Sequence, residues 1–514
     1  MKRLLVACFF SMMALTSSAQ AESQLRTIIT TDIRGLMPGS SPDDNTGLVL
    51  QNIYEGLVAW RTDGTVAPML ASDIAVSPDG KTYTFTLRDG VKFHNGASLT
   101  SHEVVWTWER FLDPKSGWPC RAYFDGTRQV KIASVEAPSP MQVVFHLAEP
   151  FGAFLSLMAR ADCDGTGIAH PDSVGADGVW SRAIGTGPFK LAEWRRGQFV
   201  ELGRNGDYAA RSEPADGLAG AKLPKIDRIR LTVVPEPAAA KAAIQSGDLD
   251  LWPSIDPKFA SELKAAGLTV ASSPVAALNA VVMQTNDPVL KDKRIREAIA
   301  AALDYQSMSD TLTDDYAKPS TSLVPVSSRY YGKVQQAGVG YDVARAKKLL
   351  TEAGYKGQPI RITTNSRFPV MNDVAVLVQA MGQQVGLNLS VEVVEFATQL
   401  SRYAKGDYQL MVWNYTPYLD PVFGLDRFTG DKATQPDRVW GNPEAIALLS
   451  KLMETAEPTA RQPLFDQLQA LFAEDAPMIV WSSGANVSAF SPAVHGYAPW
   501  PGRKPRFWNV EVAK

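Results

Sequence analysis

The sequence predicts an α/β protein made of large lobes with mixed sheets. Segments with alternating apolar residues are interleaved with segments that have a helical apolar period, and this order is typical of α/β folds. The chain has 514 residues, of which 45% are hydrophobic and 20% are charged, so its composition is that of a globular protein. This length corresponds to two large lobes or roughly three domain-sized units.

The first half of the chain predicts a β-hairpin followed by a helix. Apolar and polar residues alternate over 83–88, and the Ser-Pro-Asp-Gly sequence at 77–80 before them is typical of a tight turn. Thr100 and Glu103 form a capping box, which begins a helix that ends near Pro114.

The second half predicts three helices and a strand. One helix begins near Lys293, and a second is capped by Asp342 and stops at Gly354. Apolar residues with a helical period predict a third helix over 374–385, and a strand with alternating apolar residues follows at 389–393.

The first 21 residues have the features of a signal peptide. Lys2 and Arg3 precede an apolar run at 4–15, which is too short to span a membrane, and Ala-Gln-Ala at 19–21 is a cleavage site of the A-x-A type. The mature chain is therefore expected to start at Glu22 and to be exported. Leu-Val-Ala-Cys before the end of the apolar run resembles a lipobox, but cleavage there would leave almost no apolar region.

Charge and cysteine content narrow the possible functions. Losing the two basic residues of the signal peptide takes the formal charge from −3 to −5. This mildly acidic charge lacks the excess of basic residues that is typical of nucleic-acid-binding proteins. Two cysteines remain, Cys120 and Cys163, and an oxidising compartment favours one disulfide between them. Two free, buried thiols are the alternative.

Motifs for catalysis and for metal binding are missing from the sequence. The five histidines stand in no zinc-binding spacing, and there is no G-x-S-x-G nucleophile elbow and no complete P-loop. We therefore predict no catalytic residue, no metal site and no cofactor.

An aromatic cluster marks one candidate site. Trp413, Tyr415 and Tyr418 surround Asp420, and aromatic rings with one carboxylate can hold an ammonium group. The alternative is a strand that enters an ordinary aromatic-rich loop.

Six motifs, in a fixed order, resemble one family of exported proteins. They are YEGL at 54–57, PMLA with SPDGKTYTF at 68–85, LRDGVKFHNG at 87–96, GTGPF at 185–189, the helix at 294–304, and YD with AKKLL and AGY at 341–355. In these motifs the chain resembles the extracellular solute-binding proteins of the peptide/nickel class, which include dipeptide- and oligopeptide-binding proteins.

The resemblance implies a two-lobed periplasmic binding protein fold of type II, with mixed sheets and a hinge. Lobe one would comprise residues 22–272, with an extra subdomain at about 60–180. Lobe two would comprise 273–485, and the C-terminal segment 486–514 would return to lobe one.

The resemblance also implies a function. The chain would be a monomeric periplasmic component of an ABC importer and not an enzyme. It would capture a short peptide or peptide-like amine between its lobes and deliver it to permease subunits in the inner membrane. An opine, an oligosaccharide or a metal chelate is an alternative solute. A hydrolase on the same fold and a chaperone-like or sensory role are alternatives of other classes.

Residue roles follow from the same resemblance. In relatives, an aspartate of a W-x-x-D-x-x-D-P loop binds the ligand ammonium, and Asp420 is the aspartate that can match it, because Thr416 stands at the first acidic position. Arg367 stands where an arginine would bind the ligand carboxylate. Arg121 and Tyr123, beside the predicted disulfide, are expected to line the cleft from lobe one.

Overall fold

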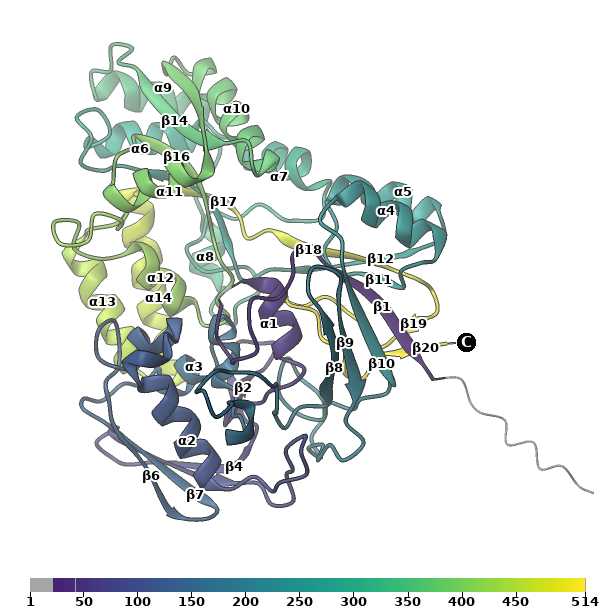
Figure 1. The fold of residues 1–514 in the computed structure, drawn as a ribbon. Coiled ribbons are helices and arrows are strands. Elements are labelled where there is room, and N and C mark those ends of the chain that lie inside the picture. Colours follow the sequence, from purple (N-terminus) through teal and green to yellow (C-terminus); the bar gives the residue numbers. More distant parts are fainter. Residues whose placement is uncertain (1–21, 42, 514) are drawn as a thin grey trace, which may run out of the picture.

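The computed structural model of the protein describes residues 22–41 and 43–513. The chain forms several separate mixed or antiparallel sheets with helices packed around them (Figure 1). The predicted signal peptide, residues 1–21, lies outside the described residues. Within the described part, every helix is too short or too polar to cross a membrane.

Two sheets together hold strands from the beginning, the middle and the end of the chain. The four-stranded sheet has the order β1 (Gln24–Ile29), β10 (Arg228–Val233), β9 (Phe199–Arg204), β8 (Phe189–Arg195). The three-stranded sheet has the order β11 (Leu251–Trp252), β18 (Ala485–Phe490), β12 (Thr269–Pro274). The accompanying elements are α1 (Asp44–Leu50), α4 (Pro237–Ser246), α5 (Ala260–Ala265), β19 (Val494–His495) and β20 (Glu511–Val512). Figure 1 shows how the late strand β18 returns to the side of the molecule where β1 lies.

The predicted hairpin is part of an antiparallel sheet. Its order is β4 (Ala71–Val76), β5 (Thr82–Leu87), β7 (Gln142–Leu147), β6 (Ile132–Ser139), and α2 (Ser101–Leu112) packs against it. Side chains of β5 alternate between buried and half-buried, and the capping box of Thr100 and Glu103 is present at the start of α2. Both predictions are confirmed. Nearby lie β2 (Val58–Trp60), β3 (Val66–Pro68) and α3 (Phe154–Met158).

A five-stranded mixed sheet organises the second half of the chain. Its order is β15 (Leu389–Val394), β14 (Ile360–Asn365), β16 (Leu410–Tyr415), β13 (Leu278–Met283), β17 (Met478–Ser482). The helices of this half are α6 (Lys293–Ala301), α7 (Tyr305–Thr313), α8 (Lys333–Ala337), α9 (Val343–Glu352), α10 (Pro369–Gln384), α11 (Phe396–Lys405), α12 (Pro421–Phe428), α13 (Pro443–Glu454) and α14 (Pro458–Asp475). The three predicted helices are confirmed as α6, α9 and α10, and the predicted strand is β15.

The chain passes between the three-stranded and the five-stranded sheet at two places. One crossing, 275–277, joins β12 to β13, and the other, 483–484, joins β17 to β18. The crossings run side by side, and the Val275 N–H donates to the Gly484 carbonyl at 3.2 Å. The predicted lobe boundaries fall beside these crossings, and the division into two lobes that move as units stays a prediction.

Two of the sequence motifs meet through close backbone contacts. A Cβ on Gly185 would lie 2.1 Å from the Ile53 carbonyl oxygen, and one on Gly187 would lie 2.5 Å from that of Asn52. Only glycine permits this approach, so the glycines of GTGPF are required by packing against the segment before YEGL. His94, from a third motif, accepts from the Gly185 N–H through Nδ1 at 3.4 Å, and its Nε2 lies 3.0 Å from the Gly187 carbonyl oxygen.

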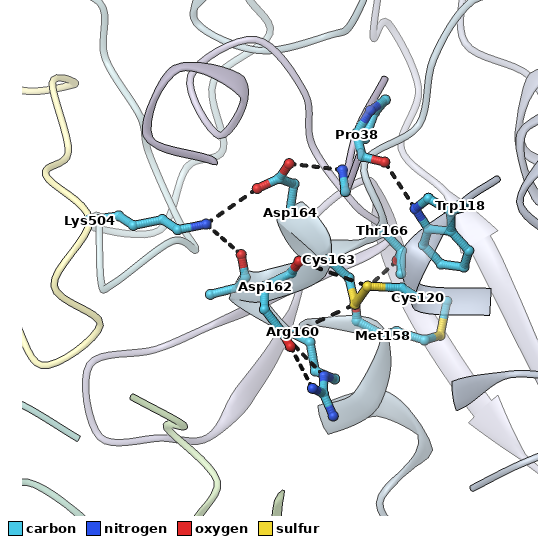
Figure 2. Close-up of a disulfide and its surroundings, with 12 residues drawn as sticks. Pro38, Trp118, Cys120, Met158, Arg160, Asp162, Cys163, Asp164, Thr166 and Lys504 are labelled. Atoms are coloured by element: carbon cyan, nitrogen blue, oxygen red, sulfur yellow. Dashed lines mark hydrogen bonds and ion pairs between the residues drawn. A yellow bond between two sulfur atoms is a disulfide. The ribbon is translucent and has the colours of Figure 1, made fainter. Parts of the chain in front are cut away.

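The predicted disulfide between Cys120 and Cys163 is present in the structure (Figure 2). Hydrogen bonds on either side of it reinforce the junction. The Trp118 indole N–H donates to the Pro38 carbonyl at 3.0 Å, and Asp164 accepts from the Gly39 N–H at 2.8 Å. The crosslink therefore joins two short segments that also hold the chain just before α1.

Removing the disulfide should destabilise the fold. Its half-cystines are 43 residues apart, and closing such a loop reduces the entropy of the unfolded chain by an amount worth about 4 kcal/mol. The double variant C120S/C163S, made in protein that starts at residue 22, should lose about this much free energy of unfolding in urea titrations. The parent, denatured without reductant, should show almost no reactive thiol. Two labelled thiols per chain would refute the crosslink.

Acid should weaken the packing around His94. Burial disfavours the imidazolium, and although the Gly187 carbonyl favours it, the pKa of His94 falls to about 4. The folded-state pKa lies below the unfolded value of about 6.5. The stability that neutral His94 contributes is therefore complete above pH 6.5 and is lost as the pH falls towards 4. His94→Gln should remove about 3 kcal/mol of this acid dependence in unfolding measured from pH 7 to pH 4. The exposed His102→Gln is the matched control, and equal slopes for His94→Gln and the parent would contradict the assignment.

Candidate functional site

Three strands of the five-stranded sheet end at one edge. β14 runs parallel to both β15 and β16, so their last residues, Asn365, Val394 and Tyr415, lie at the same end of the sheet. In open α/β sheets, ligands bind outside the carboxyl ends of the parallel strands. The loops that follow β14, β15 and β16 are therefore the first place to look for a site.

A groove of about 940 Å³ lies at this edge. One wall comes from α7, α10, α11 and the end of β16. The opposite side comes from 256–258, which precede α5, and from Arg503 near the C-terminus. The volume is at the upper end of the range of about 300–1,000 Å³ that is usual for small-molecule sites. The groove thus lies between two parts of the chain whose backbone is continuous through the two crossings.

The wall of the groove is rich in apolar side chains that reach solvent. Phe368, Val370, Val376 and Leu400 are 40–47% exposed, although each is a large hydrophobic residue. Such residues are unremarkable singly, but a contiguous exposed group of them marks a binding surface. Trp413 extends this wall from β16.

Buried amide side chains hold the wall in place. The Asn365 carbonyl oxygen accepts from the Phe368 N–H at 3.0 Å, and its amide donates to the Gln399 side chain at 2.7 Å. Gln399 in turn donates to the Val412 carbonyl at 2.7 Å, and both amide residues are fully buried. This chain of bonds ties the loop after β14, helix α11 and strand β16 together. The sequence analysis did not find it, because Asn365 and Gln399 stand in no motif.

Two of the residues predicted for the site lie at this groove. Trp413 lines it and stacks on Tyr403 with ring centroids 3.9 Å apart and planes 2° from parallel. Arg367 is exposed beside it, and its guanidinium lies 5.5 Å from the Phe368 ring and 5.2 Å from the Phe396 ring. Both rings line the groove. Its predicted contact with a ligand carboxylate stays a prediction.

Asp420 is buried and forms an ion pair within the chain. Its two carboxylate oxygens accept from the two terminal nitrogens of Arg461, each at 2.8 Å, and the residue is 2% exposed. It also caps α12 by accepting from the Val422 N–H at 3.2 Å. Burial disfavours the charged guanidinium, but the charge and hydrogen bonds of Asp420 outweigh this and raise the pKa of Arg461. Asp420 is therefore paired with Arg461 within the chain, and its predicted contact with a ligand ammonium stays a prediction.

Tyr123 and Tyr418 meet at a second cluster, outside the groove. The Arg160 guanidinium lies 3.9 Å from the Tyr123 ring, 5.2 Å from the Tyr418 ring and 5.2 Å from the Phe423 ring. Asp162 holds Arg160 through two hydrogen bonds of 2.9 and 2.5 Å. The disulfide positions both the Tyr123 and the Arg160 segments, so this cluster joins the subdomain of α2 and α3 to the loop before α12. Sequence reasoning missed Arg160, which belongs to no motif.

The two remaining predicted residues also lie away from the groove. Arg121 forms an ion pair with Asp125 at 2.5 Å. Tyr415 is buried, and its hydroxyl lies 3.1 Å from that of Tyr403. Arg121 and Tyr123 do not line this groove, and their predicted place on the ligand cleft stays a prediction.

Breaking the Asp420 pair should cost stability. Asp420→Ala leaves the Arg461 charge buried without its counterion, and the free energy of unfolding should fall by about 3–5 kcal/mol. The exposed pair of Lys81 and Glu149 offers a control, because Glu149→Ala should change it by less than about 1 kcal/mol. Urea titration measures both. A stable Asp420→Ala protein that has lost ligand binding would support the predicted contact of Asp420 with a ligand ammonium.

Comparisons with known proteins agree with this architecture. Residues 65–436 match the family described as bacterial extracellular solute-binding proteins, family 5. The probable D,D-dipeptide-binding periplasmic protein DdpA of Escherichia coli is 26% identical over 465 residues, which cover 87% of this chain and 86% of that protein. The periplasmic binding protein DppA of Helicobacter pylori, solved with the peptide STSA, has a TM-score of 0.75 at 22% identity over 96% and 99% of the two chains. NikA of Brucella suis, solved with Fe(III)-EDTA, has a TM-score of 0.82 at 22% identity over 95% and 99%. The chain therefore belongs to family 5 of the bacterial extracellular solute-binding proteins and has the two-lobed fold of periplasmic binding proteins.

Proposed function

We propose that the protein captures a short peptide or peptide-like solute in the groove at the carboxyl ends of β14, β15 and β16. It then delivers the solute to the permease of an ABC importer. The observation that carries the proposal is the groove itself, which has an exposed apolar wall on one side of the two crossings and polar residues on the other. Export by the signal peptide and a periplasmic location are part of the proposal.

Closure of the groove provides the mechanism. Bending at 275–277 and 483–484 moves the three-stranded sheet and Arg503 relative to the wall formed by α10 and α11. A solute between them is then enclosed from both sides, and closure favours the solute whose polar groups both sides satisfy. Gly484 has a φ of +76°, a conformation in which glycine is free of strain. The backbone at Gly484 can therefore turn sharply without the steric strain that a side chain would add there.

The relatives support a peptide as the solute. DdpA is named for D,D-dipeptides, and the Helicobacter pylori protein was solved with a tetrapeptide. The wall of this chain suits the same class, because peptides carry the apolar side chains that Phe368, Val370 and Trp413 can cover.

A screen of solutes tests the proposal. Dipeptides, tripeptides and tetrapeptides should raise the thermal midpoint, since a ligand at a hundred times its Kd adds about 2.7 kcal/mol to stability. Sugars and metal chelates should not raise it. Trp413→Ala should weaken the binding of an active peptide by about tenfold or more in calorimetry, because it removes an aromatic wall of the groove. Trp180→Ala, a half-buried tryptophan outside the groove, should bind as the parent does. No shift with any peptide would refute the proposed function.

A further inference from the structure

We propose that a second pocket, at the end of the five-stranded sheet opposite the groove, binds a small anion of the carboxylate or phosphate class, and that Lys432 supplies the positive charge. We call it the Lys432 pocket. It goes beyond the proposed function, because none of the described residues lines both this pocket and the groove. A solute in the groove would therefore leave the anion in place.

The Lys432 pocket forms where three strands begin. β15 and β16 are both parallel to β14, so their first residues lie at one end of the sheet, while the groove lies at the other end. β13 runs antiparallel to β16 and ends here, which places Gln284 in the wall. The loop that follows α12 contributes Lys432. The pocket has a volume of about 800 Å³, which is enough for a small organic molecule.

Neutral groups hold the ammonium of Lys432. Its Nζ donates to the side-chain oxygen of Gln284 at 2.5 Å and to the hydroxyl of Thr285 at 2.8 Å. Gln284 is only 8% exposed, and its own amide donates to the Gly406 carbonyl at 2.7 Å, so it is a fixed support. An ammonium has three N–H donors, and the described residues take two of them. The third is available to a ligand.

Lys432 is a half-buried cation with no counterion among the described residues. Burial and the nearby charge of Arg296 both lower its pKa, to about 8, whereas a carboxylate within range would raise it. Arg296 is itself a cation, and its hydrogen bonds go to backbone carbonyls. Buried charges in proteins are normally paired, so an anion is the partner that this position lacks.

The carboxylates that line the pocket are already engaged or solvated. Asp287 accepts from two backbone N–H groups and from the amide of Gln409, at distances of 2.9 to 3.1 Å. Asp407 is exposed to water, and its charge acts on Arg402. Neither carboxylate contributes to the pKa of Lys432. They therefore leave the charge of Lys432 uncompensated.

Other cations add to the positive potential. Arg361 lines the pocket and shares Glu392 with Arg402, so one carboxylate faces two guanidinium groups. Lys405 also lines the pocket, is exposed, and has no ion pair with the part of the chain that the structure describes. It lies in the last turn of α11, where it offsets the negative end of the helix dipole. The described lining thus has three cations against two carboxylates, and an anion is the complementary ligand.

Calorimetry with small ions tests the proposal. The probes are citrate, inorganic phosphate and choline, titrated into protein that starts at residue 22 in a buffer free of other oxyanions. Citrate or phosphate should bind the parent, and choline should not. Lys432→Gln, which removes the charge and keeps a hydrogen-bond donor, should weaken the binding of that anion by about tenfold or more. Lys241→Gln removes a lysine that already pairs with Glu262, and it should bind as the parent does.

Two further measurements separate the site from an effect on folding. Lys432 has no counterion to lose, so the thermal midpoint of Lys432→Gln without anion should stay near that of the parent, and the anion should raise only the parent's midpoint. In the parent itself, the bound anion should protect Lys432, but not Lys241, from acetylation by acetic anhydride, as read by mass spectrometry. This second measurement does not depend on any variant.

Each remaining outcome counts against the proposal. Binding of neither anion, tighter binding of choline, equal affinity of the parent and Lys432→Gln, or equal protection of the two lysines would overturn it. Peptides should bind the parent and Lys432→Gln equally well, so failure of the Lys432 pocket leaves the proposed function standing. If no peptide binds but an anion protects Lys432, the proposed function fails and this inference stands.

Discussion

The pair of crossings between the three-stranded and the five-stranded sheet is the constraint on which the rest of the structure depends. β12 and β18 are neighbours in one sheet, and β13 and β17 are neighbours in the other, so 275–277 and 483–484 must run side by side. The Val275–Gly484 hydrogen bond closes this junction. Both backbone connections of residues 278–482 to the rest of the chain therefore pass through one place, and their movement as a unit stays a prediction. The residues that line the groove come from both sides of this junction, with 256–258 and Arg503 on one side and α7, α10, α11 and β16 on the other.

The direction of the strands determines where the groove forms. β14 lies between β15 and β16 and is parallel to both, so three successive loops open at one edge. The buried amides of Asn365 and Gln399 bond the loop after β14 and helix α11 to β16. A satisfied buried network of this kind holds its surroundings in one arrangement. The apolar residues on α10 and α11 can therefore stay exposed without the wall collapsing.

Local signals in the sequence predicted local structure well. The capping box at Thr100 and the alternation along β5 depend on neighbouring residues, and the structure confirms both. The contacts that form the site depend instead on pairing across long stretches of chain. Asp420 and Arg461 are 41 residues apart, and nothing near Asp420 reveals its counterion. The sequence Asp420-Pro421 does carry a local signal, because an aspartate directly before a proline is typical of a helix start, with Asp as the cap and Pro at the first position. Asp420 caps α12 in this way.

The contrast between Asp420 and Asp373 separates two uses of a carboxylate. A charge that stabilises the fold is buried and paired in the empty protein, because an unpaired buried charge costs several kcal/mol. A charge that recognises a solute must instead remain without a counterion until the solute arrives, and it can do so only where water solvates it. Asp420, 2% exposed and held by both terminal nitrogens of Arg461, meets the first description. Asp373, exposed on the groove face of α10 between Val370 and Val376, is instead solvated. Motif spacing cannot tell these cases apart, because it records which residue is acidic and not whether the folded chain has already neutralised it.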